Sequence, residues 1–463
     1  MREIACDVAV IGAGTAGIAA YRAARKAGAR TLLIEAGPGG TTCARVGCMP
    51  SKLLIEAASA AQAARDAGLF GLHVPEVGID GRAVLERVRR ERDRFVRLVF
   101  EDLETFPDGE RIAGRARFLD RDRLAVGEDL RVRFRAAVIA TGSSPAVPKP
   151  LAGLGARVLT TDTVFELPDL PRTLAVIGGG PVGIELAQAM ARLGIETTLI
   201  EGGRSLAGLS EPGLVAEAAE IFGRELTLHL ETEVEAAEAD CDGLRLRWCA
   251  PRGEPREARF ERVLAAAGRP PNVTGLGLEA AGLDLDGSGV PRFDPGTLRC
   301  GDAPVFVAGD ANADRPVLHE ASRQGGIVGV NAAALAGHGG SEAPRRWPPL
   351  ALVFTHPQAG RFGAAYDPEA GDGRLTGRAS FADQGRARIA GTNAGGAVIF
   401  ADRSGRLLGG EMLGPGAEHL VQGLAQAVWD GRTVQDLLDR PVYHPTLEEG
   451  LSDALRQIGS SIS

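Results

Sequence analysis

Two stretches of the chain share one pattern of apolar and polar positions. Each begins with a short apolar run (residues 8–11 or 174–177), passes through closely spaced glycines into an alanine-rich segment that carries arginine, and ends in a second apolar run closed by a glutamate. Short apolar runs are typical of buried parallel strands, and a longer alanine-rich segment is typical of a helix. The pattern therefore predicts a strand, a glycine turn, a helix and a second strand in each stretch.

The two stretches align without a gap. The first, VIGAGTAGIAAYRAARKAGARTLLIE, ends at Glu35, and the second, VIGGGPVGIELAQAMARLGIETTLIE, ends at Glu201. Both place G-x-G-x-x-G between the first strand and the helix, which is the fingerprint of a dinucleotide-binding unit. The glycines are Gly12, Gly14 and Gly17 in the first copy, and Gly178, Gly180 and Gly183 in the second.

Each part of this fingerprint has a physical task. The first glycine makes the tight turn, the second lets the backbone approach a pyrophosphate, and the third lets the helix pack close to the strand. The helix N-terminus presents a partial positive charge to the phosphates, and the final glutamate accepts hydrogen bonds from a ribose diol. A flexible glycine loop would explain a single copy. Two copies in register with strand, helix and acid predict two bound dinucleotides.

The acid at the end of each copy bears on which dinucleotide binds. Glu201 stands where a 2′-phosphate would have to lie, and a carboxylate repels a phosphate, so the second site favours NAD over NADP. Arg204, three residues further on, leaves NADP as an alternative. By its fingerprint alone, the first site accepts either NAD or FAD.

Length and charge narrow the class of protein. A chain of 463 residues is too long for one hydrophobic core, so two to four domains are expected. The formal net charge of -8 argues against nucleic acid as a partner. No basic leader precedes the first strand, and no apolar run is long enough to span a bilayer. We therefore expect a soluble cytoplasmic protein without a membrane or nucleic-acid partner, and no metal site is predicted.

Two cysteines follow the first unit directly. Cys43 and Cys48 lie in GTTCARVGCMPSK, which ends at Lys52, one of only three lysines in the chain. In a regular helix the Cα atoms of residues i and i+5 are about 8–9 Å apart, whereas a disulfide needs about 4.4–6.8 Å. The pair therefore cannot bridge within one undistorted helix. Gly47 and Pro50 instead predict an irregular turn that leads into a helix start, where the helix N-terminus favours a Cys48 thiolate.

Such a pair could be redox-active or a static staple. A loop of this length gains little stability from closure, and disulfides in a reducing compartment are more often catalytic than structural. The redox function is therefore favoured. Cys6, Cys241, Cys249 and Cys300 stand in unrelated contexts and are expected to be ordinary thiols.

At this point the chain resembles the two-cysteine flavoprotein disulfide reductases (class I pyridine nucleotide-disulfide oxidoreductases), and among them it is most similar to the dihydrolipoyl dehydrogenases. The resemblance covers nearly the whole chain. Its motifs occur in the family's order: VIGAGTAG, GTTCARVGCMPSK, VIATGS, AAGRPPN, VFVAGDAN, LHEASRQG, VFTHPQAGRFG and YHPTLEEG.

The resemblance implies a set of site residues. For FAD they are Gly12, Gly14, Gly17, Glu35, Lys52, Thr141, Gly142, Gly309 and Asp310. For NAD they are Gly178, Gly180, Gly183, Glu185, Glu201 and Gly268. For catalysis they are Cys43, Cys48, His444, Glu449 and Lys52. In the family, Lys52 lies near the flavin and pairs with a glutamate, for which Glu185 is the candidate. His444, oriented by Glu449, would be the base that reaches the partner's Cys43 across a homodimer.

The implied fold is α/β, with two Rossmann-like dinucleotide-binding domains and a C-terminal α+β dimerisation domain. We expect residues 1–148 and 272–345 to form the FAD domain, residues 149–271 the NAD domain, and residues 346–463 the dimerisation domain. The implied reaction oxidises protein-bound dihydrolipoamide through Cys43, Cys48 and FAD, and reduces NAD. The implied partners are a second copy of the chain and a lipoylated carrier protein or 2-oxo acid dehydrogenase complex.

Several positions depart from the family pattern and keep alternatives open. Thr41 replaces a glycine, Arg45 replaces the usual asparagine between the thiols, Tyr443 stands where alanine is frequent, and Gln358 stands where glutamate is common. The alternatives are a related NAD(P)H-dependent disulfide reductase, such as a glutathione reductase-like enzyme, and a non-catalytic flavoprotein subunit. Glu201 opposes the first alternative, and the presence of both cysteines and His444 opposes the second.

Overall fold

The structure is a computed structural model that describes residues 2–250, 253–369 and 373–462. The chain divides into two compact units, each assembled from three separate segments. Unit 1 consists of Met1–Pro50, Arg90–Pro145 and Arg269–Arg346, and unit 2 consists of Ser51–Arg89, Ala146–Gly268 and Trp347–Ser463. Two helices, α3 (Cys48–Asp66) and α4 (Gly81–Glu104), contribute residues to both units.

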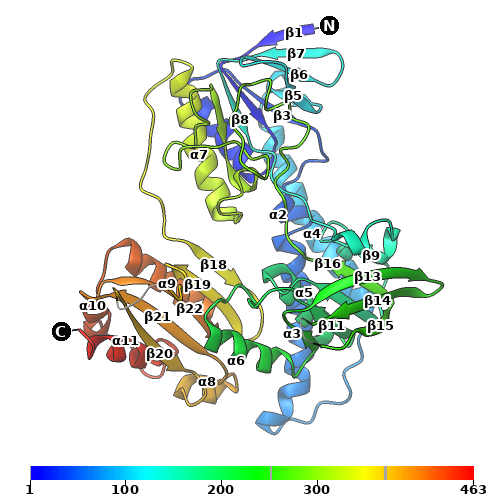
Figure 1. Cartoon of the computed structure of the whole chain (residues 1–463), viewed down its shortest axis with the longest axis vertical. Coiled ribbons are helices and arrows are strands. Elements are labelled where there is room, and N and C mark those ends of the chain that lie inside the picture. Colours follow the sequence, from blue (N-terminus) through cyan, green and yellow to red (C-terminus); the bar gives the residue numbers. More distant parts are fainter. Residues whose placement is uncertain (1, 251–252, 370–372, 463) are drawn as a thin grey trace. The chain divides into compact units, whose positions relative to one another are not determined.

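Unit 1 is built around a five-stranded parallel sheet in the order β17-β8-β2-β3-β4 (Figure 1). A second sheet, β1-β7-β6-β5, belongs to the same unit. Apart from α3 and α4, the α-helices and strands of the unit are β1 (Arg2–Ala5), β2 (Val8–Ile11), α1 (Thr15–Lys26), β3 (Thr31–Glu35), α2 (Thr42–Arg45), β4 (Arg111–Ala113), β5 (Ala116–Phe118), β6 (Arg123–Val126), β7 (Leu130–Arg133), β8 (Ala136–Ile139), β17 (Val305–Val307) and α7 (Leu318–Leu335).

The central strands of unit 1 are apolar on both faces because they are covered on both sides. Every residue of β2 and β8 is buried. Helices α1 and α7 lie against each other, and glycines in α7 make this approach possible. A Cβ on Gly325 would lie 2.2 Å from the Ala16 carbonyl oxygen, and one on Gly329 would lie 2.3 Å from that of Ala20. This contact fixes the helix that follows the first glycine turn.

Unit 2 contains a second parallel sheet in the order β12-β11-β10-β16-β9 and an antiparallel sheet in the order β18-β19-β22-β21-β20. The part of unit 2 that contains the parallel sheet consists of β9 (Val158–Leu159), β10 (Thr173–Ile177), α5 (Pro181–Arg192), β11 (Glu196–Ile200), α6 (Pro212–Phe222), β12 (Thr227–His229), β13 (Glu233–Asp240), β14 (Gly243–Cys249), β15 (Arg256–Phe260) and β16 (Arg262–Ala265). The antiparallel part holds β18 (Leu350–Val353), β19 (Gln358–Gly363), β20 (Arg374–Ser380), α8 (Gly385–Ala390), β21 (Gly396–Asp402), β22 (Leu407–Gly414), α9 (Ala417–Trp429), α10 (Val434–Asp439) and α11 (Ser452–Gly459).

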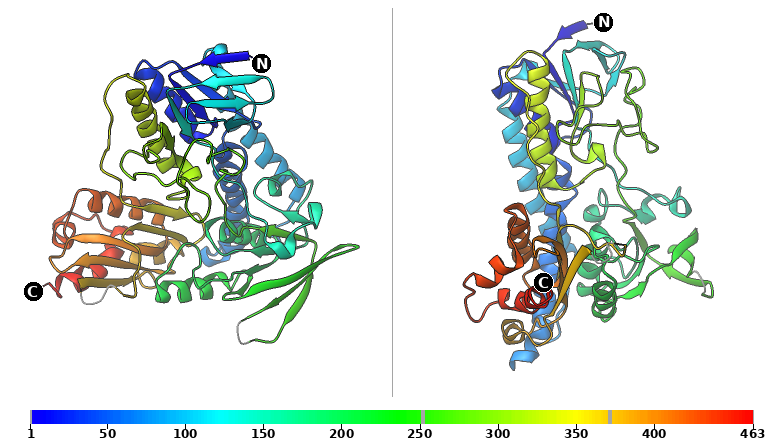
Figure 2. Two further views of the ribbon diagram at one scale, coloured as in Figure 1. Left: turned by 45° about the horizontal axis from the view of Figure 1, so that its top comes forward. Right: turned by 60° about the vertical axis from the view of Figure 1, so that its left-hand side comes forward.

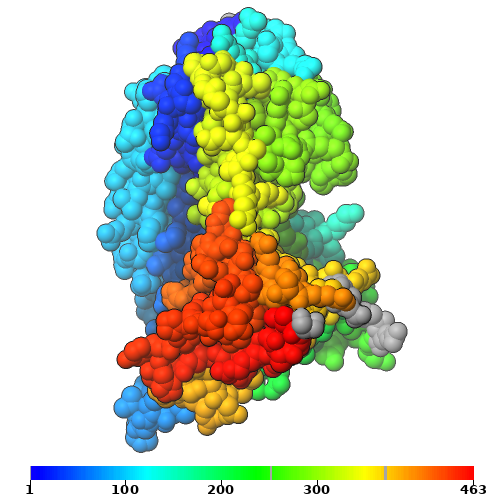
Figure 3. All heavy atoms as spheres, turned by 90° about the vertical axis from the view of Figure 1, so that its left-hand side faces the viewer, coloured from blue at the N-terminus to red at the C-terminus, as the bar shows by residue number. Residues whose placement is uncertain are grey.

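The strands β13, β14 and β15 form an antiparallel sheet of their own, whose ribbon extends outward in Figure 2. The helices α9 and α11 pack on the antiparallel sheet of unit 2, and the C-terminal helices gather on the face seen in orange and red in Figure 3. The predicted α/β class, with two dinucleotide-binding units and a C-terminal α+β part, is confirmed. Within the described residues, none of the helices combines the length and apolar character needed to cross a membrane.

Candidate active site

The first glycine fingerprint lies between β2 and α1, as the sequence predicted. Gly12 has a φ of +106°, which favours glycine. A Cβ on Gly17 would lie 1.8 Å from the Gly12 carbonyl oxygen, so α1 approaches the turn more closely than any side chain allows. A Cβ on Gly14, by contrast, would point into open space. Gly17 therefore serves the packing of the helix, and Gly14 leaves room at the helix N-terminus.

The acid of the first fingerprint is fixed at the end of β3. One carboxylate oxygen of Glu35 accepts a hydrogen bond from the Ala13 backbone N–H at 2.6 Å, and the other accepts one from the Gly37 N–H at 2.6 Å. These two bonds tie the carboxylate to the glycine turn on one side and to the loop after β3 on the other. The acid is thus held beside the fingerprint, as a ribose acceptor would have to be.

A cavity of about 570 Å³ opens over this turn within unit 1. It is lined by residues 11–14, 34–39, 41, 42, 45, 114–116, 140–142, 144, 270–272, 274 and 276. Five residues predicted to bind FAD belong to this lining: Gly12, Gly14, Glu35, Thr141 and Gly142. The cavity also includes Arg45 and Arg115, which the sequence did not predict as binding residues. The cavity brings together parts of three separate sequence segments of the unit.

Polar atoms at this cavity are arranged for a ligand. The Thr141 Oγ1 and the Arg45 Nε are buried, and neither has a hydrogen-bond partner among the described residues. A buried polar group without a partner is costly, so such atoms commonly mark the place of a bound group. The glycine turn, the fixed carboxylate and these two atoms fit a dinucleotide such as FAD.

Gly309 and Asp310 follow β17 and do not line the cavity. The Asp310 Oδ2 accepts a hydrogen bond from the Ser143 Oγ at 2.7 Å, and the Gly309 N–H donates to the Gln324 Oε1 at 2.8 Å. The Arg269 Nη2 donates to the Ser143 carbonyl oxygen at 2.9 Å. Ser143 therefore joins Asp310 to the loop after β8. The sequence motifs that contain these two residues did not predict this hydrogen bond.

The second fingerprint repeats the first within unit 2. Gly178 has a φ of +113°. A Cβ on Gly183 would lie 1.8 Å from the Gly178 carbonyl oxygen, whereas one on Gly180 would meet nothing within 4 Å. Gly268, in the loop after β16, has a φ of +110° and also faces open space. The two copies thus share the division between a packing glycine and an open glycine.

The acid of the second fingerprint is held in the same way. The Glu201 carboxylate accepts hydrogen bonds from the Gly179 N–H at 2.5 Å and from the Gly203 N–H at 2.6 Å. Arg204, the possible phosphate ligand, forms an exposed ion pair with Glu231. A fixed carboxylate and an arginine already engaged by an acid are unfavourable for a 2′-phosphate.

The cysteine pair spans a break between two helices. Helix α2 ends at Arg45, Val46 leaves the helical conformation with φ -137° and ψ 5°, and α3 begins at Cys48. A Cβ on Gly47 would lie 3.0 Å from the Thr42 carbonyl oxygen and 3.3 Å from the Cys43 Cα, so the backbone before Cys48 packs tightly on the Cys43 turn. This confirms the predicted irregular turn into a helix start. In this structure Cys43 is half-buried and Cys48 is exposed.

Thr41 adopts a backbone conformation that favours glycine. Its φ is +52° with ψ at 146°, a region in which a β-branched residue is rare. The Thr41 hydroxyl oxygen accepts a hydrogen bond from the Ala44 N–H at 3.2 Å and so caps α2. The threonine therefore caps α2 while its backbone carries a local strain of about 1–3 kcal/mol.

Lys52 and Glu185 form an ion pair in unit 2, with 2.7 Å between the Lys52 Nζ and the Glu185 Oε2. The Glu185 side chain is only 5% exposed, and its other oxygen accepts the Phe354 N–H at 2.8 Å. The Lys52 ammonium also lies 4.7 Å from the centre of the Phe354 ring. The pair therefore joins helix α3 to helix α5 and to the loop after β18.

His444 and Glu449 are also paired. The His444 Nδ1 lies 2.9 Å from the Glu449 Oε1, and the other carboxylate oxygen accepts the Thr446 N–H at 3.0 Å. The hydrogen bond from His444, followed by the one from the Thr446 backbone, lowers the pKa of Glu449 below its ordinary value. The imidazole is 82% exposed. A carboxylate that holds the Nδ1 side leaves the Nε2 of an exposed imidazole turned outward for proton transfer.

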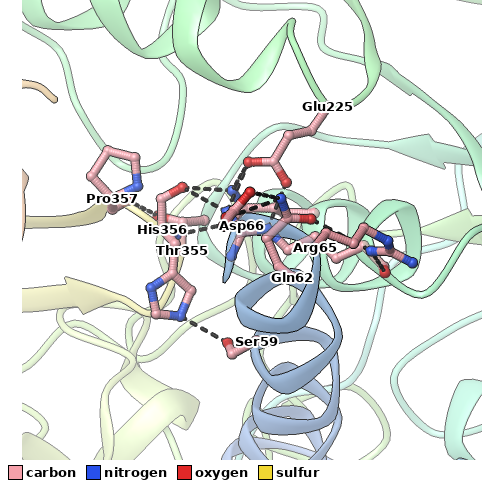
Figure 4. A network of polar contacts seen from close by, with 10 residues as sticks. Ser59, Gln62, Arg65, Asp66, Glu225, Thr355, His356 and Pro357 are labelled. Carbon is pink, nitrogen blue, oxygen red and sulfur yellow. Dashed lines mark hydrogen bonds and ion pairs between the residues drawn. The ribbon is translucent and has the colours of Figure 1, made fainter. Parts of the chain in front are cut away.

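A polar network around His356 was not predicted (Figure 4). The His356 Nε2 lies 2.9 Å from the Ser59 Oγ, and its backbone N–H and carbonyl bond to the Gln188 amide at 2.8 and 2.7 Å. Arg192 pairs with Glu225 beside it at 2.6 Å. Burial lowers the pKa of His356 below 6.5, and the neighbouring Arg192 adds to this shift. The signal in the sequence was only a THP motif, which says nothing about partners on α3 and α5.

Comparison with protein families matches residues 6–326 to the family "Pyridine nucleotide-disulphide oxidoreductase" and residues 350–455 to its dimerisation domain. The chain is 33% identical to a mercuric reductase of Shigella flexneri over 99% of this chain and 82% of the relative. It is 31% identical to a dihydrolipoyl dehydrogenase of Halobacterium salinarum over 97% of this chain and 95% of that relative.

Solved structures agree in fold. The HOCl-induced flavoprotein disulfide reductase RclA from Escherichia coli superposes with a TM-score of 0.82 at 23% identity, covering 98% of this chain and 99% of RclA. LpdA from Mycobacterium tuberculosis superposes with a TM-score of 0.83 at 24% identity, with the same coverage of both chains. At these identities the structures establish a shared fold.

Proposed function

The chain belongs to the pyridine nucleotide-disulphide oxidoreductase family, and from that premise we propose that it is an NAD-dependent dihydrolipoyl dehydrogenase. The family consists of FAD-dependent enzymes that use NAD(H) or NADP(H). The observation that carries the choice of substrate is the His444–Glu449 pair, because an exposed imidazole oriented by a carboxylate suits proton transfer to and from a thiol. A dithiol substrate needs such a base.

The residues around the first fingerprint would hold the flavin. Gly14 leaves space for a diphosphate, Glu35 offers its carboxylate to a ribose, and Gly12, Thr141 and Gly142 line the same cavity. When bound, the flavin supplies a carrier that moves an electron pair between the dithiol and the nicotinamide. Gly309, Asp310 and Lys52 are assigned to the same cofactor by the family resemblance.

The thiol exchange would proceed through the cysteine pair. His444 of a second copy of the chain takes the proton of one dihydrolipoamide thiol, and the thiolate attacks the Cys43 sulfur of the disulfide. The Cys43–Cys48 bond breaks, and Cys48 leaves as a thiolate beside the N-terminus of α3. The second substrate thiol then displaces Cys43, so lipoamide departs as the disulfide and the enzyme holds both cysteines reduced. The substrate has lost two electrons and two protons.

The nicotinamide nucleotide would bind over Gly178, Gly180 and Gly183, with Glu201 on its ribose and Gly268 beside it. Glu185 is assigned to the nicotinamide end, where its ion pair with Lys52 fixes its carboxylate. NAD leaves as NADH with the electron pair, and one proton is released. The fixed Glu201 carboxylate favours NAD, so kcat/KM for NADH should exceed that for NADPH by at least about tenfold.

A homodimer is part of the proposal, and the match of the C-terminal region to the family's dimerisation domain supports it. In a dimer, the exposed His444 of one copy would act on the substrate bound at the cysteine pair of the other copy. The lipoyl group would be carried by another protein, such as a glycine-cleavage carrier or a 2-oxo acid dehydrogenase complex. The proposal commits only to the chemistry of that group, a 1,2-dithiolane and its dithiol.

Reduction of mercuric ion is a second candidate, because a mercuric reductase is 33% identical over nearly the whole chain. One anaerobic experiment separates the candidates. The purified protein is assayed with NAD and dihydrolipoamide, with NADPH and glutathione disulfide, and with NADPH and a Hg(II)–thiol complex. The proposal expects kcat/KM for the first pair to exceed the others by at least about 100-fold. A faster reaction with Hg(II) or glutathione disulfide would refute the assignment.

A Cys43→Ser variant is the matched control for this assay. It should abolish turnover of dihydrolipoamide while NADH-to-dye transfer persists, because dye reduction does not use the exchange thiol. If neither the wild-type protein nor the variant turns over any disulfide while both reduce the dye, the protein is a flavoprotein without disulfide chemistry, and the proposal fails.

A further inference from the structure

Arg45 lies between the two cysteines in sequence, yet its side chain belongs to the first nucleotide cavity. It is the last residue of α2, and it lines the cavity together with the glycine turn and Glu35. The side chain is half-buried, and its Nε is fully buried without a hydrogen-bond partner among the described residues. A guanidinium is always charged, so a cationic group is held here with part of its donor capacity unused.

The charges around this cavity indicate what Arg45 would bind. Glu35 is the acidic side chain in the lining, and both of its oxygens already accept backbone N–H groups. Arg115 also lines the cavity, but its side chain is exposed at the surface. The half-buried Arg45 side chain therefore borders a cavity whose lining offers it no uncommitted acidic group.

We propose that Arg45 binds the diphosphate of the flavin dinucleotide directly. The planar guanidinium presents parallel donors that match two phosphate oxygens, and such charge-assisted bonds are about twice as strong as neutral ones. The glycine turn binds a diphosphate through backbone N–H groups that carry no net charge, so Arg45 adds the formal positive charge that the turn lacks.

This inference rests on the FAD dependence of the family and is independent of the disulfide substrate. A competing role is the stabilisation of a cysteine thiolate, because Cys43 lies two residues before Arg45 and Cys48 three residues after it. The place of Arg45 in the cavity lining favours the cavity role, since an arginine that serves only the exposed Cys48 thiolate would not need to be half-buried beside the glycine turn.

The test measures FAD affinity in the full-length holoenzyme. Wild type, Arg45→Met, Arg45→Gln and Arg45→Lys are ultrafiltered over a range of protein concentrations, and the released FAD is quantified by its fluorescence at low and high KCl. Arg45→Met and Arg45→Gln should each raise the FAD dissociation constant about 10- to 100-fold, and Arg45→Lys should raise it less. Added salt should weaken FAD binding more in wild type than in the Met and Gln variants.

Two further readouts separate direct binding from an effect on folding. The ³¹P resonances of bound FAD should shift in the Met and Gln variants relative to wild type, while Arg131→Met, an exposed arginine of β7 outside the cavity, should leave the affinity and the resonances unchanged. A dissociation constant within about twofold of wild type in either neutral variant overturns the inference. So does weaker binding with unchanged ³¹P resonances and unchanged salt dependence, which marks a structural role.

The thiolate alternative has its own signature. If Arg45→Gln changes only the rate at which iodoacetamide alkylates the NADH-reduced enzyme and leaves FAD affinity intact, Arg45 serves the cysteines and the inference is wrong. If Arg45→Met does not fold, the Gln variant decides, because it keeps a polar side chain of intermediate length. If wild type does not turn over lipoamide, the proposed reaction is refuted. The inference about Arg45 still stands or falls on the FAD measurements alone.

Discussion

A pair of glycine-to-alanine changes at the second fingerprint separates nucleotide binding from folding. A Cβ on Gly180 would meet no atom within 4 Å, and its φ of -66° is one that alanine adopts readily. Gly180→Ala should therefore fold normally, with a gain of about 0.4–1 kcal/mol because alanine restricts the unfolded chain. Its methyl group would nevertheless occupy the space that a pyrophosphate needs. The dissociation constant for NADH should rise about 10- to 100-fold.

Gly183→Ala should instead lower the stability of the fold. The new Cβ would lie 1.8 Å from the Gly178 carbonyl oxygen and 2.9 Å from its carbonyl carbon. Because both contacts are with backbone atoms, no side chain can turn aside, and α5 would have to move away from the turn by about 1 Å. That helix buries Ile184, Leu186 and Met190 in the main core of unit 2. Overpacking of this kind costs about 1–3 kcal/mol, which corresponds to an apparent Tm lower by about 2–10 °C.

The assay combines thermal unfolding, FAD content and the KM for NADH in dye reduction. Gly180→Ala should keep its FAD and its Tm and lose NADH affinity, and Gly183→Ala should lose Tm. The equivalent change in the first unit, Gly14→Ala, is the matched control. It should weaken FAD binding and leave the KM for NADH unchanged once FAD is saturating. Unaltered NADH affinity in Gly180→Ala would refute a nucleotide site at the second fingerprint, and an unaltered Tm in Gly183→Ala would refute the packing argument.

Three further predictions follow from the paired side chains. Lys52→Met should cost about 3 kcal/mol by leaving the buried Glu185 carboxylate without its cation, and adding Glu185→Gln should recover part of that loss in apparent Tm; additive losses would contradict a direct coupling. His444→Gln should lower lipoamide turnover at least about 100-fold and leave NADH-to-dye transfer within twofold; an equal fall in both would make His444 structural. His356 has a lowered pKa in the fold, so wild type should lose stability as pH falls below 6.5, where the unfolded chain takes up the proton more readily. The Tm difference between wild type and His356→Gln should therefore shrink from pH 7.5 to pH 5.5, and a constant difference would show that the imidazole does not titrate on unfolding.

Local patterns in the chain were sufficient to predict both nucleotide-binding units. The strand, turn and helix of each copy are confirmed, and Glu201 directly follows β11 as expected. These features are predictable because a tight turn, a close helix and a buried parallel strand each demand particular residues at fixed spacing. The break between Cys43 and Cys48 was likewise predictable, since helix geometry alone forbids a bridge across five residues. The antiparallel sheet of unit 2 was expected only from family resemblance, and the three-stranded sheet β13-β14-β15 was not predicted.

By itself, the sequence determined the local structure of the two glycine turns, of the helix start before Lys52 and of the His444–Glu449 segment. Each of these is a local arrangement whose geometry depends on neighbours only a few positions away. The pair of Lys52 with Glu185 was expected from the family resemblance, and the structure contains it. Only the tertiary structure decided that His356 bonds to Ser59 and Gln188, and that Arg45 lines the nucleotide cavity. Such contacts join distant segments, and close packing of helices on sheets selects them from many partners that the sequence alone leaves equally possible.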